Sequence, residues 1–165
     1  GPVNPSMGES PGLLVDGFDG MPYLLMPYNP PEYERLILMA GYAKVKDLLA
    51  WDVDLTSPIP ARVSRLADRV RDRFGITIRV ARLADFDAEL EIVKHLYREA
   101  WQDNWGFVPP TDREIAQLAR ELRPVVDPDL VVFATRHGEP VGCAVCVPDV
   151  NQVLKRMNGR LTPLS

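Results

Sequence analysis

Apolar side chains recur every three or four residues along five segments of the chain, which is the spacing of an amphipathic helix. Some of these segments also carry start and stop signals. Asn29 can cap the first helix, and Gly41 can close it in the left-handed conformation. Thr111 and Glu114 have the spacing of a capping box at the start of the fourth. The pattern predicts helices over residues 30–40, 59–74, 85–103, 111–122 and 149–157.

Shorter apolar runs bounded by turn residues predict strands in the rest of the chain. The clearest is residues 76–82, where apolar and polar side chains alternate as in a half-buried strand. Residues 136–140 separate two further runs and suit the turn of an antiparallel hairpin. Seven of the sixteen prolines lie within residues 1–31, which excludes a long helix there. The expected strands are residues 13–15, 23–26, 46–53, 76–82, 130–135 and 141–147.

Composition and charge narrow the functional classes. The chain has 165 residues, 46% of them hydrophobic, and a net charge of -4, so its surface as a whole does not favour nucleic acid as a partner. Residues 61–82 nevertheless hold seven Arg and two Asp, a mixture typical of an exposed helix face. No apolar run approaches the roughly 18 residues needed to cross a bilayer. We therefore expect a cytoplasmic protein with no membrane partner.

Several strings of the sequence are distinctive. An Asn-x-x-x-Tyr string at residues 29–33 opens a predicted helix that ends in a Gly-Tyr pair and precedes a predicted strand. Residues 76–147 follow the order strand, helix, helix, strand, strand, with an aromatic loop over residues 101–107 between the helices. Together these features resemble the middle of a tandem protein built from two GNAT-fold N-acyltransferase-like units.

The resemblance implies an α/β (α+β) fold in which a GNAT-like mixed sheet with flanking helices is present as two partial units. Residues 1–55 would form the C-terminal part of a first unit, and residues 56–75 an Arg-rich linker helix. Residues 76–165 would form the N-terminal half of a second unit. On this interpretation the chain is a fragment of a longer protein.

The resemblance also implies a function, the transfer of an acyl group from acyl-CoA, such as acetyl-CoA, to an amine or another small-molecule acceptor. GNAT proteins hold the pyrophosphate of the cofactor on the backbone amides of an Arg/Gln-x-x-Gly-x-Gly/Ala loop at a helix N-terminus. No such loop occurs in this sequence, so we expect the fragment to be inactive on its own. The alternative is a non-catalytic binding or interaction module that keeps the GNAT-like scaffold.

The aromatic loop supplies the candidate substrate-binding residues. By the resemblance, the acceptor pocket would be shaped by Trp101, Asn104, Trp105 and Phe107. The structural alternative is that Trp101 and Phe107 fill the core while Asn104 binds backbone in the turn. The catalytic base, the catalytic acid and the cofactor-binding residues have no candidates in the sequence.

Two further pairs of residues have a functional and a structural interpretation. Asn29 and Tyr33 could face the acyl group, although a helix cap and a core tyrosine explain them without any function. Cys143 and Cys146 lie three apart on a predicted strand, so their side chains point to opposite faces and cannot easily share one ion. We therefore expect no metal site.

Overall fold

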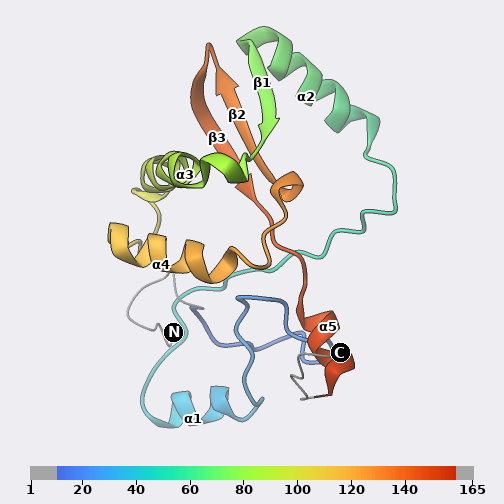
Figure 1. The fold of residues 1–165 in the computed structure, drawn as a ribbon. Helices are drawn as coiled ribbons and strands as arrows, with labels where there is room; N and C mark the ends of the chain where they lie inside the picture. The colour runs from blue at the N-terminus through green and yellow to red at the C-terminus, as the bar shows by residue number, and fades with distance from the viewer. Residues whose placement is uncertain (1–10, 159–165) are drawn as a thin grey trace. The chain divides into compact units, whose positions relative to one another are not determined.

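The computed structural model describes residues 11–158, which combine helices with one antiparallel sheet (Figure 1). The coarse α+β class expected from the sequence is confirmed. All five predicted helices are present, each within a few residues of its expected ends. The described elements are α1 (Tyr33–Met39), α2 (Ala61–Phe74), β1 (Ile76–Val80), α3 (Phe86–Trp101), α4 (Asp112–Leu122), β2 (Val131–Arg136), β3 (Glu139–Val145) and α5 (Asn151–Met157).

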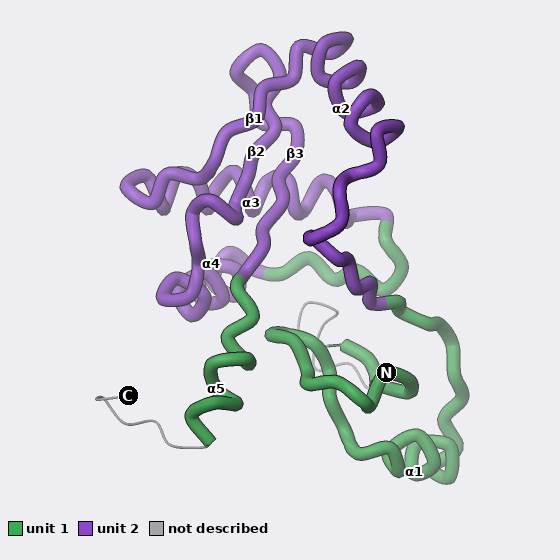
Figure 2. The backbone as a smooth tube through the Cα atoms, turned by 90° about the vertical axis from the view of Figure 1, so that its right-hand side faces the viewer, with its two compact units in different colours: residues 1–49, 104–110, 148–165 green, residues 50–103, 111–147 purple. Residues whose placement is uncertain are grey.

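The described chain divides into two compact units (Figure 2). One contains residues 11–49, 104–110 and 148–158, with helices α1 and α5. The other contains residues 50–103 and 111–147, with the sheet and helices α2, α3 and α4. The sequence analysis expected boundaries after residues 55 and 75, between parts of two GNAT-like units. Those boundaries stay a prediction.

The three strands form an antiparallel sheet in the order β1-β2-β3. The predicted hairpin is confirmed as the β2–β3 pair, with a register shift between Ala134 and Thr135. His137 and Gly138 turn the chain, both with positive φ, at 52° and 88°. Two positive φ angles in a two-residue loop give the backbone twist that matches the right-handed twist of the flanking strands, which explains the tight connection.

The core of the sheet unit lies where α3 crosses one face of the sheet. Phe133 on β2 is fully buried, and Val131 on β2 and Leu96 on α3 are more than nine-tenths buried. Val131 and Phe133 are two residues apart on β2, so strand alternation places both on the same face of the sheet. Four partly buried side chains pack against them: Ala81, Ile92, Val93 and Val126.

Residues 11–54 contain no strand, so the predicted strands at 13–15, 23–26 and 46–53 are wrong. The predicted runs are apolar, but a strand also needs a partner whose backbone completes its hydrogen bonds. The prolines around the first two runs remove donors from that ladder. Residues 46–53 are exposed along their whole length, with no adjacent strand.

Helix capping follows the sequence at some ends and departs from it at others. Thr111 and Glu114 form the predicted capping box on α4. Gly41 ends α1 and Gly75 ends α2 in the left-handed conformation, as expected. Asn29 does not cap α1, because the chain reaches helical geometry only at Glu32, three residues later, where no side chain caps the helix.

Candidate functional site

Helix α1 carries an apolar groove of about 280 Å³. Its floor is the helix face made by Tyr33, Leu36, Ile37 and Ala40, which recur at helical spacing. The fifth lining residue, Tyr42, comes from beyond the helix end. The predicted apolar face of this segment is therefore present, and it forms one side of an open groove.

The end of α1 explains how Tyr42 reaches the groove. Gly41 donates its N–H to the Leu38 carbonyl at 3.0 Å, and Tyr42 donates to the Ile37 carbonyl at 3.3 Å. This pair of bonds is the Schellman arrangement, which requires a left-handed residue, here Gly41 with φ 86°. The arrangement turns the residue after glycine back toward the last helical turn, so Tyr42 and Ile37 line the same groove.

The groove offers hydrocarbon and aromatic surface and almost no polar groups. Tyr33 and Leu36 are each about half exposed, at 47% and 49%, so the groove is open to solvent. Such a surface can bind an apolar chain through the hydrophobic effect, at about 0.8 kcal/mol for each methylene buried. Among its five lining residues, Tyr33 and Tyr42 alone carry an ionisable group, the phenol.

The Asn29 side chain forms hydrogen bonds with the backbone of Leu14 and Pro30. Its side-chain oxygen accepts the Leu14 N–H at 2.8 Å, and its amide donates to the Leu14 carbonyl at 3.2 Å. The amide also donates to the Pro30 carbonyl at 2.9 Å. One side chain thus satisfies both backbone groups of a residue that has no strand partner. The hypothesis that Asn29 contacts a substrate stays a prediction, and its side-chain amide already donates two hydrogen bonds.

The predicted acceptor residues are divided between the two units. Trp101 ends α3 in the sheet unit, stacks on Tyr97 with ring centroids 5.6 Å apart, and is 46% exposed. Asn104, Trp105 and Phe107 belong to the other unit. Their role in binding an acceptor stays a prediction.

Within its own unit the 104–110 segment is a turn. The Asn104 carbonyl accepts the Phe107 N–H at 3.1 Å, and Gly106 adopts φ 70° between them. Trp105 is 55% exposed, with the Lys46 ammonium 5.3 Å from its ring centroid. A cation over an indole face is a weak attraction at an exposed site.

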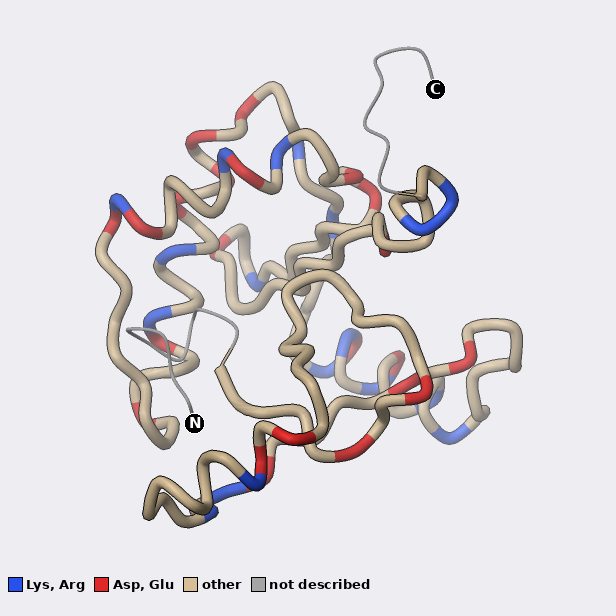
Figure 3. The backbone as a smooth tube through the Cα atoms, turned by 90° about the horizontal axis from the view of Figure 1, so that it is seen from below, with Lys and Arg blue, Asp and Glu red and all other residues tan. Residues whose placement is uncertain are grey.

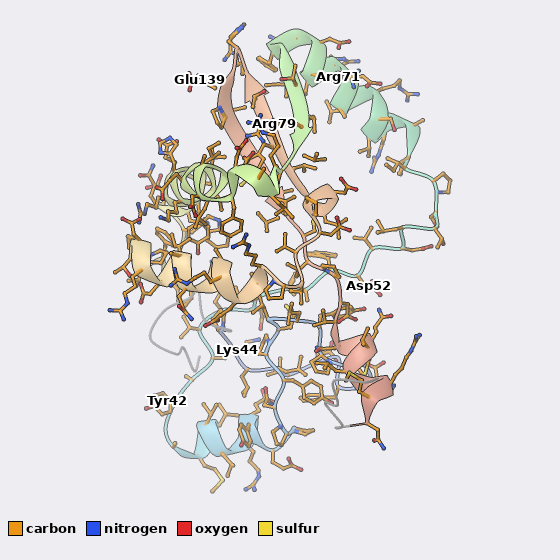
Figure 4. The ribbon with its side chains drawn as sticks, in the orientation of Figure 1. Tyr42, Lys44, Asp52, Arg71, Arg79 and Glu139 are labelled. Atoms are coloured by element: carbon orange, nitrogen blue, oxygen red, sulfur yellow. The ribbon has the colours of Figure 1, made fainter. Side chains whose placement is uncertain are left out.

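The sheet unit contains a partly buried ion pair that the sequence interpretation missed. Both signs of charge are interspersed along the described backbone (Figure 3), but Glu89 on α3 has a side chain only 8% exposed. Arg79 on β1, labelled in Figure 4, donates to its two oxygens at 2.7 and 2.9 Å. The same guanidinium lies 4.5 Å from the Phe133 ring centroid. The detectable signal was Glu89 itself, a carboxylate three residues after Phe86 on the apolar face of a helix.

This ion pair sets the protonation state of Glu89. Hydrogen bonds from Arg79 hold the pKa of the Glu89 carboxyl below its ordinary value of 4.5, against the opposing effect of burial. The Arg82 backbone N–H adds a bond at 3.3 Å. A carboxylate held ionised in this way is a poor general base at neutral pH, so the pair is structural.

Charged side chains also connect α3 to α4, through Lys94 and Arg98 on α3 and Asp112 on α4. Lys94 is nine-tenths buried, and its ammonium lies 2.6 Å from Glu91 and 3.8 Å from Asp112. Arg98 donates to Asp112 at 2.8 Å and lowers the pKa of that carboxyl.

Among residues 11–158, no group of three or more His, Cys, Asp or Glu side chains could hold a metal ion. No helix in the same range is long and apolar enough to cross a membrane.

Comparison with known proteins gives two relatives that match almost the whole chain. The chain is 38% identical over 163 residues to a protein of Caulobacter vibrioides strain NA1000 / CB15N named bacterial ceramide synthase. It is 34% identical over 164 residues to the protein YghO of Escherichia coli K12. Each match covers 99% of this chain and 42% of the relative, so the chain spans well under half of either protein. No family model and no solved structure matches.

These relatives overturn the resemblance to tandem GNAT-fold proteins. The proteins that match the chain are named bacterial ceramide synthase and YghO, and no GNAT family or fold matches it. The physical reason for the error is that the order strand, helix, helix, hairpin is common to many α+β folds. The strings that carried the resemblance contain a helix terminator and a turn, which many folds use for the same local reasons.

Proposed function

We propose that the protein carrying this chain joins a fatty acyl group to the amino group of a long-chain lipid amine. The observation that carries this proposal is the 38% identity to a protein named bacterial ceramide synthase, over 99% of the chain. A ceramide is an amide between a fatty acid and a long-chain base, so its synthesis is acyl transfer to an amine. That reaction class agrees with the amine acylation expected from the sequence.

The groove on α1 supports this proposal. Its lining of Tyr33, Leu36, Ile37, Ala40 and Tyr42 suits a hydrocarbon chain, and both substrates of the proposed reaction carry one. At about 280 Å³ the groove is slightly smaller than an ordinary ligand pocket and could hold part of such a chain. We assign it to the acyl chain, which keeps the sequence-based hypothesis that Tyr33 faces the acyl group.

We take the acyl donor to be acyl-CoA, as the sequence interpretation expected. The neutral amine attacks the thioester carbonyl, the carbon–sulfur bond breaks, and the proton lost by the amine is balanced by one gained by the leaving thiolate. Glu89 does not serve this proton transfer, because Arg79 occupies both of its oxygens. The contribution of the α1 groove would be to bind and orient the donor, which raises the effective concentration of the reacting carbonyl.

The experiment is an assay of the whole protein with a long-chain base and acyl-CoA donors of increasing chain length. Amide product is measured by mass spectrometry and released thiol by a colorimetric reagent. Helix α1 provides a matched pair of variants, since Leu36 lines the groove while Leu38, 53% exposed, does not. We expect Leu36→Asp to raise the KM for a long-chain donor about tenfold, and Leu38→Asp to leave it unchanged.

The assay tests both the groove assignment and the acyltransferase activity. A rise in KM that is restricted to long-chain donors and to Leu36→Asp supports the groove assignment, and equal effects of both variants contradict it. Absence of amide product with every donor contradicts the acyltransferase. Saturable binding of long-chain acyl-CoA without product would favour the competing function, a non-catalytic binding module.

A further inference from the structure

Helix α2 is exposed on every face, including the face that its sequence makes apolar. A surface helix of a globular protein normally packs such a stripe against a core. Within the sheet unit nothing covers this stripe, although α2 has the length and the terminating glycine of a well-formed helix. The stripe consists of four side chains that are 47%, 59%, 42% and 43% exposed: Val63, Leu66, Val70 and Phe74. Ile59, two residues before the helix, is 70% exposed.

The charged residues of α2 are arranged in a definite order around this stripe. With about 3.6 residues per turn, Arg62, Arg69 and Arg73 fall along one border of the stripe, and Arg71 falls along the other. Arg65, Asp68 and Asp72 fall on the side opposite the stripe. Cations therefore flank the apolar residues, and both acids lie at the centre of the polar face.

The ion pairs of α2 engage one of its four border arginines, Arg71, and leave the other three without an ion-pair partner among the described residues. Arg71 lies 2.8 Å from Asp68 and 3.6 Å from Asp72, and all three side chains are more than half exposed. Arg62, Arg69 and Arg73 form no ion pair with any described residue. With five arginines and two aspartates, the helix carries a net charge of +3 on a chain whose total is -4.

We propose that α2 lies in the surface of an anionic lipid bilayer, with its apolar stripe in the acyl region and its border arginines at the headgroups. A strongly amphipathic helix of low overall hydrophobicity, with cations beside its apolar face, has the composition of interfacial helices. Arginine suits the border because its aliphatic stem lies on apolar surface while its guanidinium reaches the phosphates. The acids of α2 then face water, away from the anionic lipid.

Two other occupants fit the arrangement less well. Nucleic acid would account for the arginines, but it offers no apolar phase for a stripe that includes Leu66 and Phe74. A protein core would account for the stripe, but burial there would bring the border arginines to the edge of a low-dielectric region without the carboxylates that normally pair with them. Anionic lipid supplies an apolar phase for the stripe and, directly beside it, negative charge for the border arginines.

This inference stands independently of the proposed acyl transfer. The finding that no described helix can cross a membrane concerns spanning helices, whereas α2 would lie parallel to the surface. A surface-bound helix would bring the chain to the phase in which long-chain lipid substrates reside. Binding to vesicles and formation of amide are measured separately, so either proposal can fail without the other.

The test is cosedimentation of the protein with vesicles at physiological ionic strength. Vesicles of phosphatidylcholine alone are compared with vesicles that also contain phosphatidylglycerol. We expect binding to the mixed vesicles only, weakening as salt is raised. A double-stranded DNA of the same charge concentration serves as a competitor, and displacement by DNA with no preference for anionic vesicles would overturn the proposal.

Matched variants distinguish the geometry of α2 from its charge. Arg69→Gln removes a border arginine and should weaken binding to the mixed vesicles about fivefold. Arg65→Gln removes the same charge from the opposite side and should have less than a twofold effect. Leu66→Gln removes apolar surface and should weaken binding about tenfold, with an unchanged circular dichroism spectrum because Leu66 is exposed.

The proposal fails if the two arginine variants weaken binding equally, since the effect would then be one of net charge. It also fails if Leu66→Gln leaves vesicle binding intact. Sedimentation velocity on the same samples measures the oligomeric state, and so tests whether a second copy of the chain covers the apolar stripe of α2. If Leu66→Gln dissociates an oligomer and vesicle binding is absent, then α2 is a protein interface and the lipid proposal is wrong.

Discussion

Helices α2 and α3 belong to the same unit and have the same kind of amphipathic sequence, but they have opposite surroundings. Helix α3 lies against the sheet, where Leu96, Lys94 and Glu89 are more than nine-tenths buried. Helix α2 precedes β1 directly and buries no residue at all. The difference teaches that an apolar stripe predicts a helix with a face to cover, but does not predict what covers it.

The same contrast separates the ion pairs of the two helices. Arg79 and Glu89 meet beside the core through two short bonds, with the Phe133 ring beneath the guanidinium. Arg71 and Asp68 meet in solvent on α2, within a single helix turn. Figure 4 shows the two labelled arginines, one projecting from β1 among packed side chains and one from α2. The comparison predicts a large energetic role for the first pair and almost none for the second.

The largest expected effect is that of Phe133→Ala. Phe133 is fully buried, so its truncation leaves a cavity beneath Arg79 and should lower the free energy of unfolding by about 3–5 kcal/mol. Phe74→Ala removes the same atoms from α2, where the ring is 43% exposed, and should cost less than about 1 kcal/mol. Urea unfolding measures both. Equal costs would mean that α2 has a packed partner in solution.

The next effect is that of Arg79→Met. It leaves the buried Glu89 carboxylate with only its contacts to Arg82 and should lower the free energy of unfolding by about 2 kcal/mol at pH 7. Arg71→Met on α2 is the control, and we expect no measurable change, because its pair is exposed. If both variants unfold at the same urea concentration as the unsubstituted chain, the distinction between the two pairs is wrong.

The pH dependence of Arg79→Met sharpens this result. In the unsubstituted chain the pKa of Glu89 is held below 4.5, so its stabilising effect is present above that value and is lost as pH falls through the folded-state pKa. Without Arg79, the Arg82 N–H and guanidinium still favour the ionised form of Glu89, but burial is opposed less strongly, so the pKa of Glu89 should rise relative to the unsubstituted chain. The variant should therefore lose less stability than the unsubstituted chain as pH falls below 4.5, because less of its stability depends on ionised Glu89. Urea unfolding of both proteins above and below pH 4.5 measures the difference.

A smaller effect is expected from Thr111→Ala, which removes the cap of α4. The Thr111 hydroxyl accepts the Glu114 N–H at 3.3 Å, and the Glu114 carboxylate accepts the Thr111 N–H at 2.6 Å. Loss of the hydroxyl should cost about 1 kcal/mol, whereas Thr111→Ser keeps it and should cost little. Thermal unfolding of the two variants gives the difference. A larger loss for Thr111→Ser than for Thr111→Ala would rule out the capping explanation.

The smallest effect on stability is expected from Leu66→Gln. The side chain is 59% exposed on a helix with no described partner, so the free energy of unfolding should change by no more than about 0.5 kcal/mol. Leu96→Ala on α3 is the buried counterpart and should cost about 2–5 kcal/mol. A cost above about 2 kcal/mol for Leu66→Gln would place the stripe of α2 in a packed core.

The sequence predicted the helices better than the strands, for a physical reason. A helix satisfies its backbone within one segment, so the spacing of apolar residues and a terminator such as Gly41 or Gly75 suffices to locate it. The β2–β3 hairpin was predictable because the two strands that pair are separated in the sequence by only a short turn. The prediction of strands within residues 13–53 was wrong because the apolar runs there have no neighbouring strand to complete their hydrogen bonds.

The candidate site was predicted in part. The apolar face that includes Tyr33 was visible as helical periodicity, and the structure places it in the α1 groove. The Schellman turn that adds Tyr42 depends on two backbone bonds that no single residue specifies. The Arg79–Glu89 pair joins a strand to a helix ten residues later, and its depth of burial depends on β2, which lies still further along the chain.

By itself, then, the sequence determined the local elements of this protein: five helices, a hairpin, and the glycines that end two helices. Only the tertiary structure decided which apolar faces are covered. Phe133 and Leu96 are buried because β2 and α3 meet, while Leu66 and Phe74, equally apolar and equally well placed on their helix, stay exposed. Local hydrogen bonding is set by neighbours in the chain, whereas burial is set by segments far apart in it, and the hydrophobic effect acts on whichever surfaces those segments bring together.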